Sequence, residues 1–451
     1  MKHKISFILV ILGFLIFSSI YSFTQQSQSK YFELENGLKV FLQERHTLPL
    51  LNITIAVNVG SKDETDETSG LVHILEHCIL FGGTELRSGS EIRKDIRNHG
   101  AYFNAHTERD LITFDISLPS EYADFALQNQ REILFNLKLS QEEVEKEKEV
   151  ILEEIAQIKD DPLRYASSLI YQNLYKNHPY QNPIIGSEEI INAATPEKIE
   201  EFYRGFFIPS NCSLAVVGEF NIEEMEEKVK NSFGNLKKEE FSPLKYEKTL
   251  PVQKTIEIEE EMDVNQAYLL IGMPGPDYNH SDQYLVDLLV QVLGRGLNPM
   301  LGLALRGRRN LVQNISMQYT AQKYGGAILI ILNLEPKNLK SAKNAAIRFL
   351  KQSRRERYSK NDFLPDDQLY ALDFLECAKN QIKFDLFRSR EKGLNVANSL
   401  ARYLLLNEDN ERGSYIENME KARSSDLRKA AAKYLSTGKY VIVSILPKKK
   451  K

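Results

Sequence analysis

Cysteine is scarce in this sequence. The 451 residues include three cysteines, Cys78, Cys212 and Cys377, which are odd in number and far apart along the chain. Small secreted domains that depend on disulfides carry even sets of closely spaced cysteines. The sequence therefore contains no disulfide framework, and we expect all three side chains to be buried free thiols.

A strong net charge and a biased composition are also missing. The formal net charge is −4, and no Pro-rich, Gly-rich or Ser-rich tract interrupts a composition with 42% hydrophobic and 27% charged residues. Such a composition is typical of folded globular domains, and nothing in the overall charge indicates a nucleic-acid partner. We expect the basic C-terminal residues 447–451 to be a solvated end.

Long apolar runs are absent except at the N-terminus. Lys2, His3 and Lys4 precede an apolar run at residues 5–20, and a polar stretch follows. This pattern is typical of a secretory signal and predicts export across the inner membrane, to the periplasm. The run is shorter than the roughly 20 residues of a membrane-spanning helix, but no A-x-A cleavage site follows it. Residues 1–24 are therefore predicted to be a signal peptide or, alternatively, an uncleaved N-terminal membrane anchor.

The order of the predicted elements repeats along the chain. In the first half, Asn36-Gly37 marks a hairpin, and residues 51–80 form a strand followed by a helix. Residues 111–119 alternate like a strand, and Ser140 with Glu143 forms a capping box for a long helix. In the second half, residues 265–294 repeat the strand and helix, and residues 426–447 repeat the helix, turn and strand of residues 199–220.

The repeat predicts the domain organisation. Residues 237–251 are charged, contain two prolines and lack periodicity, which is typical of a linker. We therefore expect two similar domains, at residues 31–240 and 251–451. Strands that alternate with long helices predict the α+β class, with a largely antiparallel sheet packed by helices in each domain.

The residues most suggestive of chemistry are His73, Glu76 and His77 in the predicted helix of the first half. On a helix, positions i, i+3 and i+4 lie on one face, so two imidazoles can share one zinc ion. Glu76 lies beside the second imidazole, where it can act as a general base for a metal-bound water. This H-x-x-E-H order is the inverzincin signature. The alternative is a core or surface helix on which the histidines are not ligands.

The flanking residues favour the metal site. The stretches LENGLKVFLQE, VNVGSKDE, SGLVHILEHCILFGGT and NAHTERDLITF resemble, in order and spacing, the N-terminal half of the pitrilysin/insulinase family of zinc peptidases. The resemblance covers nearly the whole chain after the N-terminal segment. It is closest to the short two-domain members, of the bacterial or mitochondrial-processing-peptidase-like type. It implies that each chain binds one Zn²⁺.

The resemblance also implies the remaining members of the zinc site. The third ligand of the family is a glutamate on a later helix, and Glu154 follows His77 at the family's spacing of 77 residues. The family often has a second glutamate two turns earlier on the same helical face, which supports the site without binding the metal, and Glu147 is at that position. A helix so rich in glutamate could also carry both as ordinary surface residues.

The second half resembles the family's substrate-binding region but departs from it at one position. Arg309 matches the arginine of an Arg-x-x-x-Tyr pair that holds substrate carbonyl groups in the family, whereas Gln313 replaces the tyrosine. Tyr319 is too far along the chain to be an obvious replacement. Aligning the two halves brings Asp287, Val290 and Gln291 opposite His73, Glu76 and His77, so we expect the second half to be catalytically silent.

The family binds its substrate as an extended strand at a sheet edge beside the zinc. Residues 111–119 are our candidate for that edge strand, and Asn104 and Ala105 match family positions that line the backbone of the bound peptide. Asn104 could instead be an ordinary turn residue, and Arg309 could be one of a solvated cluster of arginines.

We therefore expect a zinc metalloendopeptidase that cleaves extended peptides or small unfolded proteins with Glu76 as the general base. The alternative is a structural subunit of an envelope assembly that binds zinc but does not cleave peptides. Longer family members enclose the substrate between two such two-domain units, so this chain supplies half of a clamshell chamber and should dimerise. The partner is either a second copy or a homologous subunit that lacks zinc but carries the Arg-x-x-x-Tyr pair.

Overall fold

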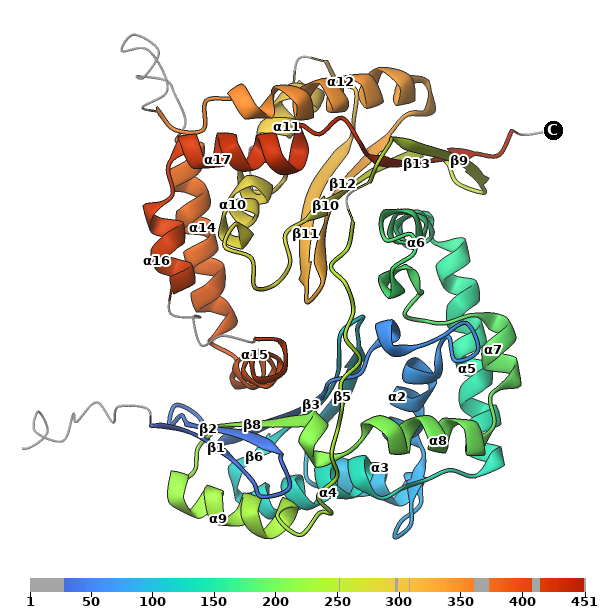
Figure 1. Cartoon of the computed structure of the whole chain (residues 1–451), viewed down its shortest axis with the longest axis vertical. Helices are drawn as coiled ribbons and strands as arrows, with labels where there is room; N and C mark the ends of the chain where they lie inside the picture. The colour runs from blue at the N-terminus through green and yellow to red at the C-terminus, as the bar shows by residue number, and fades with distance from the viewer. Residues whose placement is uncertain are drawn as a thin grey trace, which may run out of the picture.

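The computed structural model describes residues 28–250, 252–296, 299–307, 309–360, 373–407 and 414–449. The predicted signal or anchor at residues 1–24 lies outside these ranges. No helix within the described ranges is both long enough and apolar enough to cross a membrane. Two sheets, each packed by helices, form the lower and upper halves of the molecule in Figure 1.

The first sheet has six strands. In spatial order they are β1 (Ser29–Glu33), β2 (Lys39–Glu44), β8 (Cys212–Gly218), β3 (Leu50–Val57), β6 (Ile112–Pro119) and β5 (Tyr102–Thr107). The β2–β8 pair is parallel and the other pairs are antiparallel. The hairpin between β1 and β2 turns at Asn36-Gly37 as predicted, because Gly37 adopts a φ of 90° that side chains disfavour.

The second sheet repeats this arrangement. Its strands follow the spatial order β9 (Ile256–Met262), β13 (Val441–Pro447), β10 (Ala267–Gly275), β12 (Gly325–Leu334) and β11 (Asn314–Gln322). The β9–β13 pair is parallel, like β2–β8, and the others are antiparallel. Strand order and directions match the first sheet from β2 to β5, which confirms the predicted α+β fold of two similar halves.

Helices cover one face of each sheet and bury an apolar core against it. In the first half they are α2 (Leu71–Phe81), α3 (Gly89–Asn98), α4 (Ala123–Phe135), α5 (Gln141–Asp160), α8 (Pro196–Phe206) and α9 (Ile222–Phe233). In the second half they are α10 (Gln283–Gly294), α12 (Leu339–Gln352), α14 (Phe374–Ser389) and α17 (Ser424–Ala430). Figure 1 also labels the helices α7 (Glu188–Ala193), α11 (Met300–Gly302) and α16 (Ser414–Lys421).

The opposite face of each sheet is covered by a helix from the other half. Helix α6 (Pro162–Leu174) packs on β10 and β13 of the second sheet, and α15 (Gly393–Leu406) packs on β3 and β8 of the first. Figure 1 shows both helices in the space between the two sheets. Because β3 and β8 are covered on both faces, their residues read as nearly continuous buried runs. The two halves are therefore interlocked by an exchange of helices.

The predicted linker has no regular secondary structure at residues 237–250, yet it is not detached from the halves. The Tyr246 hydroxyl donates a hydrogen bond to Asp63 over 3.1 Å, and the Thr249 amide donates one to the Tyr324 carbonyl over 2.8 Å. The last residues of this connection therefore contact both halves.

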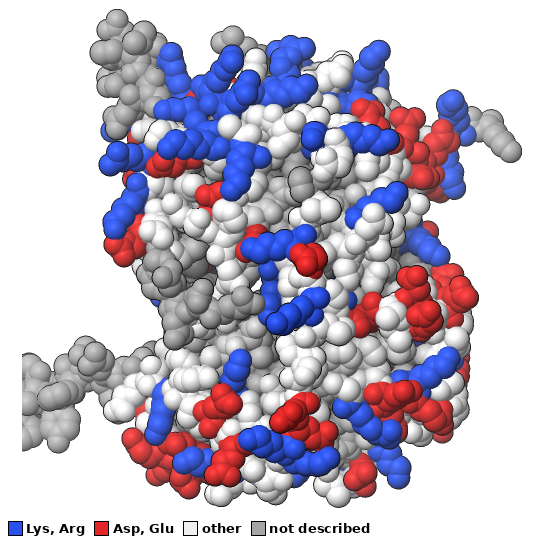
Figure 2. Space-filling model, viewed as in Figure 1, with Lys and Arg blue, Asp and Glu red and all other residues white. Residues whose placement is uncertain are grey.

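Charge divides between the halves. Residues 25–250 include 24 Lys and Arg against 39 Asp and Glu, whereas residues 251–451 include 32 against 23. Figure 2 shows basic side chains gathered at the end of the second half, where Lys340, Arg348 and Lys351 of α12 lie exposed. The first half, which carries the predicted metal ligands, is the acidic one, and its net field favours the approach of cations.

One expectation about cysteine is wrong. Cys78 and Cys212 are buried free thiols, but Cys377 is exposed. It lies in the first turn of α14, where residues such as Leu375 and Ala378 face the core and Cys377 does not. A single cysteine in a helix with both polar and apolar residues does not indicate whether it lies on the buried or the exposed face.

Candidate metal centre

Helix α2 positions the predicted ligands, and its start is well defined. Gly70 caps the helix with a φ of 100°, and a side chain there would also meet the Gly186 backbone 2.8 Å away. The buried Glu64 carboxylate accepts hydrogen bonds from the backbone amides of Gly70 (3.0 Å) and Val72 (2.8 Å). An acceptor at this end satisfies helix amides that have no partner within the helix. Burial nonetheless raises the pKa of Glu64 to about 8.

The structure brings His73, His77 and Glu154 together. One ligand atom from each lies within 4.8 Å of the others. Glu154 Oε2 is 3.8 Å from His73 Nε2 and 3.9 Å from His77 Nε2, and the two imidazole rings meet edge to face. Glu154 reaches the histidines because α5 packs against α2. Two helices that are distant in sequence therefore supply the three groups.

Glu147 lies behind His77, as the sequence predicted for a supporting residue. Its Oε2 is 3.1 Å from His77 Nδ1, and both side chains are about nine-tenths buried. This hydrogen bond places the proton of His77 on Nδ1 and leaves the Nε2 lone pair facing Glu154. Burial lowers the pKa of His77, but the bond to Glu147 and the charges of Glu154 and Glu76 outweigh it and leave the pKa raised.

His73 has a different environment. Burial, and then the neighbouring His77, lower the pKa of His73 to about 4, so its imidazole is neutral at physiological pH. Its Nδ1 is buried and has no hydrogen-bond partner among the described residues. A neutral imidazole with a free Nε2 lone pair is the form that binds a metal.

The donor set is one that catalytic zinc sites use. Two imidazoles and one carboxylate are ligands of catalytic zinc sites, which keep a fourth position for water. Bonds of about 2.0 to 2.2 Å at tetrahedral angles separate ligand atoms by roughly 3.4 Å. The observed distances of 3.8 and 3.9 Å from Glu154 Oε2 to the two imidazole nitrogens are about half an ångström wider than this.

Glu76 lies on the same face of α2 but is not part of this cluster. Its carboxylate accepts a hydrogen bond from the Thr107 hydroxyl, at the end of β5. Burial raises the pKa of Glu76, and the bond to Thr107 offsets part of this effect. The carboxylate is thus held beside the cluster with one oxygen engaged by the neighbouring strand.

The edge strand beside the cluster is β5, so our choice of residues 111–119 is wrong. Those residues form β6, which pairs with β3 on one side and β5 on the other. Asn104 and Ala105 lie in β5 itself, and Asn104 is therefore not a turn residue. Residues 112–119 alternate apolar and polar side chains, whereas residues 102–107 do not, so the sequence marks β6 and not β5 as a strand. The pairing order shows that, among the described strands, β5 lies at the edge of the sheet.

The structure does not bring Arg309 to the cluster. Arg309 is exposed in the turn between the π-helical segment Leu303–Gly307 and β11. Among the described residues, no hydrogen bond or ion pair joins Arg309 to α2. The Gln313 amide pairs with the Asn333 carbonyl, so its backbone belongs to the second sheet. The Tyr319 hydroxyl donates to the Pro276 carbonyl over 2.8 Å, which agrees with its exclusion as a replacement for the tyrosine.

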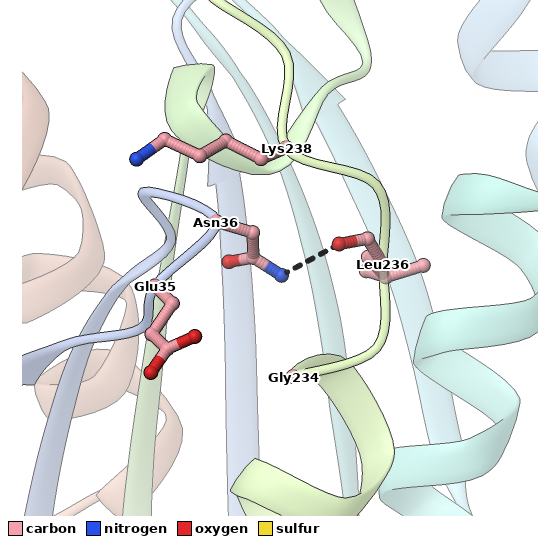
Figure 3. A pocket seen from close by; sticks show the side chains of 5 residues that line it. All are labelled: Glu35, Asn36, Gly234, Leu236 and Lys238. Carbon is pink, nitrogen blue, oxygen red and sulfur yellow. Dashed lines mark hydrogen bonds between the residues drawn. The ribbon is translucent and has the colours of Figure 1, made fainter.

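A pocket elsewhere in the first half is not a competing site. It opens at the turn between β1 and β2 and is lined by Glu35, Asn36, Gly234, Leu236 and Lys238 (Figure 3). The Asn36 amide donates to the carbonyls of Phe233 and Leu236, and this ties the hairpin to the end of α9. The polar groups of this pocket serve the fold.

Comparison with known proteins agrees with the geometry. Residues 39–188 match the family description "Insulinase (Peptidase family M16)", and residues 193–364 match "Peptidase M16 inactive domain". The chain belongs to the M16 peptidase family. The second match covers much of the half that lacks the histidine pair.

Several relatives of this M16 chain are named as zinc proteases. It is 25% identical to the uncharacterized zinc protease YmxG of Bacillus subtilis over 67% of this chain and 72% of the relative. It is 25% identical to the zinc protease PqqE of Helicobacter pylori over 92% of both chains. A solved structure of a Helicobacter pylori protease superposes with a TM-score of 0.83 at 23% identity, covering 93% of this chain and 100% of that one.

Sequence reasoning missed the residues that surround the β5–β6 turn. Thr107 contacts Glu76, and Glu108 pairs with Arg402 of α15, which is almost 300 residues away. In the stretch NAHTERD, the family resemblance pointed to Asn104 and Ala105 only. The many polar residues in this stretch indicate hydrogen bonding, but their bonding partners lie on other elements and cannot be predicted from the stretch itself.

Proposed function

We propose that this protein is a zinc-dependent peptidase that hydrolyses peptide bonds in extended peptides or small unfolded proteins. The observation that carries the proposal is the convergence of His73, His77 and Glu154 with a separately held carboxylate, Glu76, on the same helical face. The names of the relatives as zinc proteases support the same activity.

Each residue has a distinct role in this proposal. His73, His77 and Glu154 would hold one zinc ion per chain, and Glu147 would keep His77 in the required tautomer. When bound, the ion supplies Lewis acidity and lowers the pKa of a water molecule to roughly 7. Glu76 accepts a proton from the attacking water and transfers it to the nitrogen of the leaving amine.

The free edge of β5 would bind the substrate. An extended peptide can add to this edge through main-chain hydrogen bonds, with Asn104 and Ala105 lining its backbone. Binding through main-chain hydrogen bonds depends more on an extended conformation of the peptide than on its side chains. This favours unfolded substrates. Arg309 would contribute only if substrate binding or a partner chain brings it closer, because in this structure it stays in its own half.

We also propose that the working enzyme is a dimer and that it acts in the periplasm, after export by the N-terminal segment or while anchored by it. The replacement of the family tyrosine by Gln313 favours a heterodimer with a zinc-free homologue that carries the Arg-x-x-x-Tyr pair. Light scattering and peptide cleavage by the purified chain test this. Full activity of the isolated chain would contradict an obligate partner.

The activity is tested with Glu76→Gln, which keeps the shape of the side chain. The wild type and the variant should bind one equivalent of zinc, and the variant should cleave an unstructured peptide at least about 10²-fold more slowly. Equal rates would rule out Glu76 as the base. A zinc-loaded wild type that cleaves nothing, alone or with a homologous partner, would instead favour a structural subunit of an envelope assembly.

A further inference from the structure

The turn between β5 and β6 connects the proposed substrate strand to the proposed general base. Thr107, the last residue of β5, hydrogen-bonds the Glu76 carboxylate through its hydroxyl, and its backbone also contributes. Within the first half, the amides of Ser61 and Lys62 donate to the carbonyls of Glu108 and Arg109, both over 3.1 Å. A movement of this turn would therefore displace the donor that Glu76 uses.

The second half also holds this turn. Arg402 of α15 forms a two-pronged ion pair with the Glu108 carboxylate, and the second prong, from Nη2, measures 2.7 Å. The Lys323 amide, in the turn between β11 and β12, donates to Asp110 over 3.0 Å. Asp110 also accepts from the Tyr180 hydroxyl. Two elements of the silent half thus hold the residues that follow Thr107.

We propose that Thr107 is a positioning residue for Glu76, and that the second half keeps Thr107 in place through the Arg402–Glu108 pair. The proposal rests on the proposed peptidase function and assigns the second half a part in it. A buried carboxylate on a helix can occupy several rotamers, and a fixed donor selects one of them. The Thr107 hydroxyl is such a donor because β5 is locked into the sheet by β6.

The arrangement also couples the base to the substrate. A peptide that adds to the edge of β5 restrains the strand whose last residue contacts Glu76. The same strand therefore fixes the positions of both the Glu76 carboxylate and the bound peptide backbone. A misplacement of about 1 Å between the two would reduce the rate by up to about 10²-fold. An arginine fork suits the remote restraint, because its two parallel bonds fix orientation as well as distance.

The first experiment compares Thr107→Val with Thr107→Ser. Valine keeps the shape but removes the donor, and serine keeps the donor. We expect Thr107→Val to lower kcat roughly 10-fold with little change in KM or zinc content, and Thr107→Ser to retain most of the activity. Crystal structures of the zinc-loaded variants should show the Glu76 carboxylate displaced or in two rotamers in Thr107→Val only. An unmoved carboxylate in Thr107→Val would overturn the proposal, whatever the activity.

The second experiment tests the remote restraint with a double-mutant cycle. Arg402→Leu and Glu108→Gln should each lower kcat a few-fold, and the double variant should fall no further than either single one, because the two residues act as a unit. Arg204→Leu, which removes a 2.7 Å Arg–Glu pair on the outer helix α8, is the matched control and should leave kcat unchanged. Additive losses, or an equal loss in the control, would overturn the role of the pair.

These results separate the two claims. A wild type that does not cleave peptides contradicts the proposed function, but the crystal structures still decide whether Thr107 positions Glu76. A wild type that cleaves peptides, with Thr107→Val equally fast and Glu76 unmoved, keeps the peptidase and rejects the positioning role.

Discussion

Helices α2 and α10 occupy equivalent places in the two halves, and their difference shows how one fold can carry a candidate metal site in one half and packing contacts in the other. Each follows the central strand of its sheet and packs on the same face. On α2 the inward face carries His73, Glu76 and His77, whereas α10 has Asp287, Val290 and Gln291 at these positions. Asp287 accepts a hydrogen bond from the Tyr415 hydroxyl over 2.7 Å, so its carboxylate serves the packing of α16.

The exchanged helices differ as well. Helix α6 is held on the second sheet by an apolar cluster that includes Ile170 and Leu270, and Gly272 lets Ile170 approach β10 closely. Helix α15 meets the first sheet through a smaller apolar cluster, in which Leu400 packs beside Ala397, and through polar contacts, including Asn398 to Asp115 and Ser213 to the Ala401 carbonyl. The α6 contact therefore buries the larger apolar cluster, and the α15 contact combines a smaller one with hydrogen bonds. The α15 contact lies on the sheet that carries the proposed substrate strand.

The variant His77→Gln tests the difference between α2 and α10 most directly, because it places in α2 the glutamine that α10 has at the equivalent position, Gln291. We expect zinc to be lost and peptide cleavage to fall on the order of 10³-fold, because the metal contributes several kcal/mol of transition-state stabilisation. Zinc content by atomic absorption and a peptide assay measure this. The reverse change, Gln291→His, should bind no zinc because Asp287 and Val290 complete no site. Retention of zinc by His77→Gln would contradict the ligand assignment.

The contrast between the exchanged helices predicts unequal losses of stability. Ile170→Ala removes a fully buried side chain and should lower the free energy of unfolding by about 2 to 5 kcal/mol. Asn398→Ala removes the long hydrogen bonds, 3.3 to 3.5 Å, that its amide nitrogen donates to Asp115 and Thr113, and should lower the free energy of unfolding by about 1 kcal/mol. Denaturant unfolding of both variants tests the difference. Equal losses would show that the α15 contact is as dependent on packing as the α6 contact.

The remaining prediction concerns the pH dependence contributed by Asp287, the counterpart of His73. Burial raises the pKa of Asp287 to about 6, so the folded protein binds more protons than the unfolded chain between about pH 4 and pH 6. The free energy of unfolding should therefore fall as the pH rises through this window. Asp287→Asn cannot ionise, so its stability relative to the wild type should increase by about 1 to 3 kcal/mol from pH 4 to pH 7. Parallel curves of stability against pH would contradict this.

Local patterns predicted much of the fold. The hairpin at Asn36-Gly37, the capping box of Ser140 with Glu143 and the repeated order of elements depend on neighbouring residues, and the structure confirms them. The position of β5 at the sheet edge was not predicted, because residues 102–107 lack the regular alternation of β6 and because pairing order is a long-range property. The exposure of Cys377 was missed because a cysteine is small enough to fit either face of a helix.

The candidate site divides in the same way. The spacing of His73, Glu76 and His77 determines by itself that they share a helical face, because the helical period needs no partner. Glu154 was assigned through a family resemblance, and its zinc-binding role stays a prediction, although the structure places it near both imidazoles.

The sequence alone determined the repeated α+β pattern and the pair of histidines on one turn of α2, since both follow from local periodicity. Only the tertiary structure decided that α5 brings Glu154 to that turn and that β5 lies at the edge of the first sheet. It also decided that α6 and α15 each pack on the sheet of the other half, and that Arg402 reaches Glu108 from the second half. These contacts join residues far apart along the chain. They follow from the packing of helices and sheets, because each apolar face must be buried against another element, and the local sequence does not reveal which element that is.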